Sequence, residues 1–164
     1  MKKIIIYTSI LVFSLANIQA QKIANNAIGL RIGDADGFGT EINYQRAIFD
    51  TNRLEIGLGW QDGNGFNAFK LSGFYEWVWL LDGSFNWYAG VGAGIGTFSL
   101  DDDFPGGNDV DEFFVNAAGT IGIEYSFDFP LLLSLDFRPE IGLLNDVDDD
   151  LEFEIALGIR YQFN

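Results

Sequence analysis

Ionisable side chains of both signs alternate with apolar ones along several stretches of this sequence. In the stretch 152–163, Glu154 and Arg160 fall on one side of an extended chain, and Phe153 and Leu157 fall on the other. Two carboxylates held close together could act as a general acid and a general base. Carboxylates interleaved with arginines form a structural ionic network instead, because opposite charges satisfy one another. We predict such a network, with the members Arg31, Glu41, Arg53, Glu55, Lys70, Glu76, Glu124, Asp136, Arg138, Glu140, Glu154 and Arg160.

Two residue types that support chemistry are missing, because the 164 residues include no cysteine and no histidine. Disulfides and thiol chemistry are therefore excluded, as are imidazole metal sites and histidine-based acid–base catalysis. The formal net charge of −15 argues against nucleic acid as a partner, because phosphate binding needs clusters of lysine or arginine. The composition therefore predicts neither an active site nor a nucleic-acid interface.

Aspartate is concentrated in the segments 101–111 and 145–150. Their carboxylates could gather around Ca²⁺, which takes about six to eight oxygen ligands, or bridge to anionic lipopolysaccharide through a divalent cation. The alternative is a solvated run of like charges that keeps the segments soluble. The ligands of the hypothetical metal site are Asp101, Asp102, Asp103, Asp109, Asp111, Asp146, Asp148, Asp149 and Asp150.

The elements that position these side chains are eight runs with a period of two, separated by residues typical of turns. Each run has one apolar face and one face of glycine and charge. This pattern predicts an all-β fold, an eight-stranded antiparallel up-and-down transmembrane β-barrel, as one domain of residues 21–164. The runs are Ala27–Asp34, Gly37–Ile48, Arg53–Asp62, Phe66–Trp79, Phe85–Leu100, Glu112–Phe127, Leu131–Leu144 and Glu152–Phe163.

Alternation alone leaves open which face of the barrel points outward. A soluble, lipocalin-like barrel would enclose the apolar face around a ligand and expose the charged one. A transmembrane barrel turns the apolar face to lipid. The charged face here is rich in glycine and poor in lysine, which favours the membrane orientation. Aromatic residues near the run ends also favour it, namely Trp60, Trp77, Trp79, Phe85, Trp87, Phe113, Tyr125, Tyr161 and Phe163.

The first 20 residues have the pattern of a secretory signal peptide. Lys2 and Lys3 precede the apolar run Ile4–Leu15, and the expected cut follows Ala20. An N-terminal membrane anchor is the alternative, but about 12 apolar residues are fewer than the roughly 18–20 that a spanning helix needs.

The segments between the runs alternate in character. Loops rich in Asp, Gly or Asn follow the odd-numbered runs, and the tight turns Phe49–Asn52, Leu80–Ser84 and Asp128–Pro130 follow the even-numbered ones. This alternation fits a barrel with both termini in the periplasm. The fifth and sixth runs exceed the roughly 9–11 residues needed to cross a membrane. We therefore expect them to project as a hairpin with 101–111 at its tip.

The signal peptide, the eight runs and the last run together resemble the small eight-stranded outer-membrane barrels of the OmpX and OmpA transmembrane-domain type. The most specific motif is formed by Gly158, Tyr161 and Phe163, which resembles the C-terminal insertion signal of such proteins, although Asn164 adds one residue. The resemblance implies the outer membrane of a Gram-negative bacterium and contact with outer-membrane lipid and lipopolysaccharide. It also implies insertion by the barrel-assembly machinery, and a monomer.

The resemblance extends in architecture alone to enzymatic barrels, namely lipid A acyltransferases and deacylases, phospholipases and omptin-type proteases. These families rely on a catalytic histidine, which is missing here. We therefore expect no enzymatic activity, and a structural or cell-surface interaction role through acidic external loops. A narrow, weakly cation-preferring channel is the alternative. In that case Arg138 and Arg160 would be central to the gate, although an eight-stranded barrel is just wide enough to be filled by its own side chains.

Overall fold

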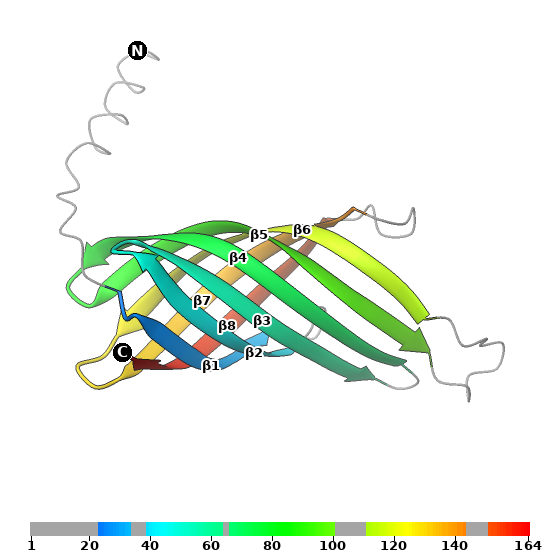
Figure 1. Ribbon diagram of the computed structural model, residues 1–164, viewed down its shortest axis with the longest axis horizontal. Helices are drawn as coiled ribbons and strands as arrows, with labels where there is room; N and C mark the ends of the chain where they lie inside the picture. The colour runs from blue at the N-terminus through cyan, green and yellow to red at the C-terminus, as the bar shows by residue number, and fades with distance from the viewer. Residues whose placement is uncertain (1–22, 34–38, 64–65, 101–110, 144–150) are drawn as a thin grey trace, which may run out of the picture.

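The computed structural model describes residues 23–33, 39–63, 66–100, 111–143 and 151–164, and these form a closed antiparallel barrel (Figure 1). Each strand pairs with its neighbours in sequence, and the first strand pairs with the last. No helix among the described residues is long and apolar enough to cross a membrane. The strands are β1 (Asn26–Gly33), β2 (Thr40–Phe49), β3 (Asn52–Gly63), β4 (Phe66–Asp82), β5 (Phe85–Leu100), β6 (Asp111–Ser126), β7 (Leu131–Gly142) and β8 (Leu151–Phe163).

The predicted all-β fold is confirmed, and the eight predicted runs match the eight strands to within a few residues. The largest difference is in β4, which continues from the predicted end at Trp79 to Asp82 because residues 80–82 still pair with the start of β5. The predicted signal peptide and the start of the second run at 37–38 lie outside the described residues.

The barrel has two distinct ends. β1 begins and β8 finishes at one end, together with the three tight turns after β2, β4 and β6, and we call this the terminal end (Figure 1). The connections after β1, β3, β5 and β7 are made at the opposite end, which we call the loop end. The predicted alternation of the connections between the two ends is therefore observed.

The apolar face of each strand points outward and the charged face points inward. On β8, Glu154 and Arg160 are buried in the lumen, whereas Ile155, Leu157 and Ile159 are about half exposed on the outside. The alternative of a soluble, lipocalin-like barrel is therefore wrong, because such a barrel would bury the aliphatic residues and expose the charges. An apolar outer surface of this kind is stable where lipid covers it.

Aromatic residues form a partial girdle on the outside of the terminal end. Trp79 and Trp87 stack across β4 and β5 with ring centroids 4.3 Å apart. Phe85 and Tyr125 meet edge to face at 4.7 Å, and the contacts continue through Phe127 into the turn after β6. The rings lie where the interface of a membrane would meet the barrel.

The pairing of β5 with β6 continues at the loop end beyond the last β6–β7 pair. It reaches Ser99–Asp111, whereas the last β6–β7 pair is Asn116–Gly142 and one further backbone hydrogen bond joins Leu143 to Val115. β4 pairs with β5 as far as Phe66–Leu100. The predicted hairpin extension is therefore a sheet that also includes β4, and the tip at 101–110 lies outside the described residues.

Candidate functional site

The candidate site is the lumen, because the polar side chains of the described residues are concentrated there. All twelve residues of the predicted network are buried inside the barrel. Each takes part in at least one ion pair. The alternation that predicted an inward face therefore also brings these residues into contact.

The centre of the lumen is organised around Glu55 of β3. One carboxylate oxygen accepts hydrogen bonds from Arg160 at 3.1 Å and from the Gln45 amide at 2.6 Å. The other accepts from Arg138, whose guanidinium also lies 3.3 Å from both oxygens of Glu41. One carboxylate thus joins two guanidinium groups from β7 and β8 on the far side of the barrel.

The guanidinium groups of the two central arginines, Arg138 and Arg160, are also held by further partners. Arg160 donates to Asn43 at 3.0 Å and to Ser134 at 2.7 Å. Arg138 lies over the ring of Phe74, 4.4 Å from its centroid, a cation–π contact that adds to its ion pairs. The lumen therefore fixes these arginines from several strands at once.

Towards the loop end, ion pairs join strands that meet at the closure of the barrel. Arg31 of β1 donates to Asp136 of β7 at 2.7 and 2.9 Å and to Glu154 of β8 at 2.7 Å. Lys70 and Asn116 both donate to Glu140. Asp136 and Glu140 are thus each held by cationic or amide donors, which is the arrangement of a structural network rather than of a general acid and a general base.

Towards the terminal end, Arg53 of β3 joins two carboxylates. Its Nε lies 2.5 Å from Glu76 and its Nη1 lies 2.8 Å from Glu124. Its guanidinium also lies 4.8 Å from the centroid of the Tyr88 ring, and the hydroxyl of Tyr88 donates to Asp136 at 3.2 Å. Tyr88 therefore connects the terminal group of charges with the group near the loop end.

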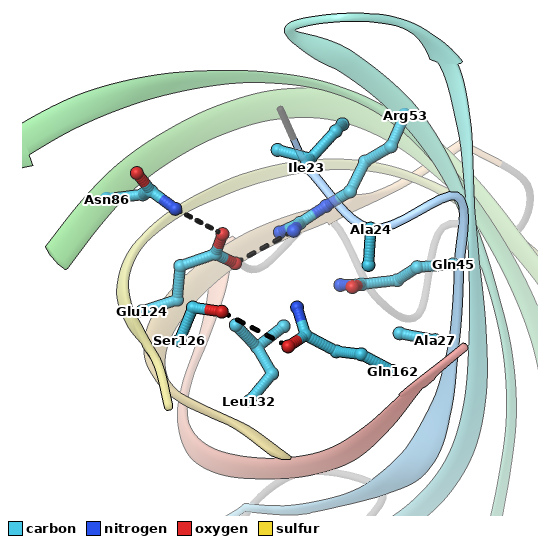
Figure 2. Close-up of a pocket in the computed structure, with 10 residues that line it drawn as sticks. All are labelled: Ile23, Ala24, Ala27, Gln45, Arg53, Asn86, Glu124, Ser126, Leu132 and Gln162. Carbon is cyan, nitrogen blue, oxygen red and sulfur yellow. Dashed lines mark hydrogen bonds and ion pairs between the residues drawn. The ribbon is translucent and has the colours of Figure 1, made fainter. Parts of the chain in front are cut away.

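A small polar cavity of about 30 Å³ lies beside Arg53 at the terminal end (Figure 2). Arg53, Gln45 and Gln162 point toward its centre, and Ile23 and Ala24 cover it from the N-terminal side. The Nη2 of Arg53 has no protein partner. The volume suffices for one or two water molecules, which would satisfy this donor.

The middle of the lumen is closed to water. The accessible fraction is 1% for each of Glu55, Arg138 and Arg160. A water-sized gap beside a side chain would leave part of its surface accessible, so these charges lie against other atoms on all sides. The network therefore acts as a plug within the described part of the barrel.

Inward-facing glycines make room for the long charged side chains. A Cβ at Gly57 would lie 2.4 Å from the Glu41 carboxylate carbon, one at Gly33 would lie 2.3 Å from a Glu154 oxygen, and one at Gly158 would lie 2.5 Å from Arg160 Nη1. The same holds on β5, where Gly90 lies beside Glu76 and Gly94 beside Lys70. The space left by these glycines is occupied by the network.

The lumen also contains uncharged partners of the network and apolar residues that were not predicted from the sequence. Their inward direction follows from the same alternation, because they share a strand face with the predicted charges. The sequence pattern did not indicate whether these side chains or empty space beside the glycines would fill the lumen between the charges. The polar members are Asn43, Gln45, Ser72, Tyr88, Asn86, Asn116, Thr120 and Ser134, and the apolar members include Phe74, Val78 and Leu132.

Two predicted sets of residues remain, the insertion signal and the hypothetical Ca²⁺ ligands. Gly158 faces the lumen beside Arg160 and Ser134, whereas Tyr161 and Phe163 lie on the outside with their rings 6.3 Å apart. Of the hypothetical Ca²⁺ ligands, Asp111 begins β6, and the others at 101–103, 109, 146 and 148–150 lie outside the described residues. Among the residues that the structure does describe, no group of acidic side chains has the arrangement of a metal site.

No protein-family model and no curated protein sequence matches the chain. Solved structures share its fold. The N-terminal β-barrel domain of Pseudomonas aeruginosa OprF superposes with a TM-score of 0.68 at 14% identity, covering 85% of this chain and 98% of that one. Neisserial surface protein A superposes with a TM-score of 0.60 at 14% identity, covering 84% of this chain and 94% of that one. Ail, the attachment invasion locus protein of Yersinia pestis, superposes with a TM-score of 0.54 at 15% identity, covering 84% of this chain and 96% of that one. At this identity the likeness establishes the fold of a small transmembrane β-barrel.

Proposed function

We propose that this chain is a non-enzymatic integral protein of the outer membrane, with a plugged lumen and a role in membrane structure or in contacts at the cell surface. The observation that carries the proposal is the combination of an apolar outer surface with a lumen of paired, water-excluded charges. Charges paired across the barrel join strands far apart in sequence, and opening the ring would leave buried charges without partners. Such a lumen leaves the outer surface and the loops as the parts available for interaction.

The proposal places both termini in the periplasm and the acidic loops outside the cell. The connections after β1, β5 and β7 at the loop end are longer than the three turns at the terminal end, which supports this orientation. The signal peptide over 1–20 would direct export. Insertion by the barrel-assembly machinery would use Gly158, Tyr161 and Phe163. The barrel is proposed to act as a monomer in contact with lipid and lipopolysaccharide.

The loops are the proposed site of interaction because the plug leaves the lumen without an open binding cavity at its centre. Ail carries attachment in its name, and the chain described here would present aspartate-rich loops for contacts at the cell surface. Ca²⁺ held by the aspartates at 101–111 and 145–150 would bridge these loops to anionic groups such as lipopolysaccharide. The narrow-channel alternative is disfavoured by the closed middle of the lumen.

The test of the membrane barrel is gel mobility of the mature chain, unboiled and boiled, after refolding in detergent or in plain buffer. We expect a band that shifts on boiling only after refolding in detergent, because the apolar outer surface needs amphiphile to cover it. The detergent-free sample is the matched control. A compact, monodisperse protein in buffer alone would contradict the proposal.

A further inference from the structure

Arg46 is the exception to the sorting of cationic residues in this barrel. Within the described part of the chain, the other lysine and arginine side chains are buried in the lumen and ion-paired. Arg46 lies on the outward face of β2, is exposed, and forms no ion pair with a described residue. The cost of an unpaired cation on a surface that faces lipid depends on its depth in the membrane.

The position of Arg46 along β2 places it near the membrane interface. It lies three residues before Phe49, where β2 ends and the turn of the terminal end begins. An arginine at the membrane midplane would cost roughly 2–4 kcal/mol, but the cost falls to about 0–1 kcal/mol near the interface. The side chain is also long enough to extend toward the headgroups while its stem stays against apolar surface.

The neighbours of Arg46 combine one further polar group with apolar side chains. Asn26 of β1 lies directly opposite Arg46, and Leu54 of β3 lies on its other side. The hydroxyl of Tyr44 donates to Asn26 Oδ1 at 2.6 Å, which orients the Asn26 amide and leaves its nitrogen as a second donor on the residue paired with Arg46. On the side of Asn26 away from Arg46, Phe163 of β8 is paired with Asn26. The donor side chains of Arg46 and Asn26 thus have apolar and aromatic neighbours on both sides.

We propose that Arg46 and Asn26 bind the phosphate of a phospholipid headgroup in the leaflet at the terminal end of the barrel. A guanidinium matches the geometry of phosphate oxygens, and the charge-assisted hydrogen bonds are strong. A phospholipid fits better than free phosphate, because the exposed Leu54, Ile48 and Phe49 beside the donors would contact its glycerol and acyl chains. The proposal rests on the proposed function, since it requires a barrel surrounded by lipid.

The experiment follows the Nε–H resonances of the arginines by NMR in maltoside micelles, whose headgroup has no phosphate. The resonance of Arg46 is assigned from its loss in Arg46→Gln. Dioctanoyl phosphatidylglycerol is then titrated into the micelles, and dioctanoylglycerol, with the same acyl chains and no phosphate, is the matched control. We expect a saturable shift of Arg46 with the phospholipid alone, while the resonances of the buried Arg31 and Arg138 stay in place.

A second variant keeps the cation and removes its neighbour. Asn26→Ala is expected to weaken the saturation of the Arg46 shift about tenfold, the effect of losing one hydrogen bond to a charged group. An equal shift with dioctanoylglycerol, or no shift at all, would overturn the proposal. A shift of the same size with inorganic phosphate would also overturn it, because the site would then recognise a free anion.

The two proposals fail in different ways in this experiment. A heat-modifiable band in the maltoside sample shows that the barrel has folded, whatever the arginine resonances do. A folded barrel with an unresponsive Arg46 would contradict the phospholipid site alone. A chain without a heat-modifiable band would contradict the membrane barrel itself.

Discussion

Charged side chains in this lumen are linked in groups, so the loss of one affects more than one partner. Glu55 illustrates this, because Arg138 and Arg160 meet at its carboxylate. Both arginines are 1% exposed, so water cannot replace a lost partner without rearrangement. Breaking a buried ion pair on one side is more harmful than removing both partners, since the remaining charge stays buried.

At the residue scale, we therefore predict that Glu55→Gln lowers the free energy of unfolding by about 3–5 kcal/mol. The amide keeps the volume of the side chain but cannot neutralise the two guanidinium groups. Urea titration of the refolded barrel, followed by tryptophan fluorescence, measures the change. The matched control is Asp62→Asn on the same strand, where the carboxylate is exposed at the loop end and a change within about 0.5 kcal/mol is expected. Equal losses in the two variants would contradict the prediction.

The residues of the network could be predicted from sequence, but their pairing could not. Alternation assigns Arg31 and Glu154 to inward faces without indicating that they meet, because they are separated by 123 positions. Their contact depends on the closure of the ring and on the registers of β1 with β8. Uncharged partners such as Asn43 and Ser134 were missed for a related reason, because only the geometry of Arg160 selects them.

At the element scale, several inward-facing glycines lie against the neighbouring strand with no room for a Cβ. A Cβ added to Gly92 of β5 would lie 2.2 Å from the carbonyl oxygen of Gly73 and 2.5 Å from the Phe74 ring. The backbone oxygen is fixed by the ladder between β4 and β5, so it cannot move aside as a flexible side chain can.

We predict that Gly92→Ala destabilises the barrel by about 1–3 kcal/mol, the range for overpacking in a tight interior. Gly73→Ala is the matched control on the neighbouring strand, because an added Cβ there meets nothing within 4 Å. The folded fraction of each variant, read from the unboiled band after refolding in detergent, checks the difference. Equal folded fractions would show that β4 and β5 can separate locally at no cost.

The existence and order of the strands could be predicted because a period of two is a strong local signal. Strand ends and interruptions depend on the neighbours. β7 shows this at Pro139, which has no N–H to donate. The β6–β7 pairs pass from Ala118–Glu140 to Ile121–Phe137 with none between them. The sheet that β4, β5 and β6 form at the loop end likewise depends on how these strands are aligned with one another. The alternation within a single run carries no information on that alignment.

At the scale of the whole molecule, the barrel reverses the usual distribution of polar and apolar residues. Its apolar belt is on the outside, and its interior is filled by ion pairs, glycines and a few apolar residues such as Phe74 and Leu132. The plug is not uniform along the axis, because the cavity beside Arg53 at the terminal end has room for water and the centre has none. Closure of the lumen therefore depends on the central side chains.

Removal of one of these central side chains is predicted to open the lumen. Arg138→Ala would delete the group that lies against Glu41, Glu55 and Phe74. Water would enter the gap, which would be lined by Glu41, left without a cationic partner, and by Glu55, which keeps Arg160. In planar bilayers we expect the unmodified barrel to be silent and the variant to show small, cation-preferring openings. The matched control is Arg46→Ala, which removes an arginine side chain from the outer surface instead of the lumen. This variant is expected to be silent. Openings of equal size in the unmodified barrel would mean that the ionic network does not close the lumen, and a folded but silent Arg138→Ala would mean that other side chains do so.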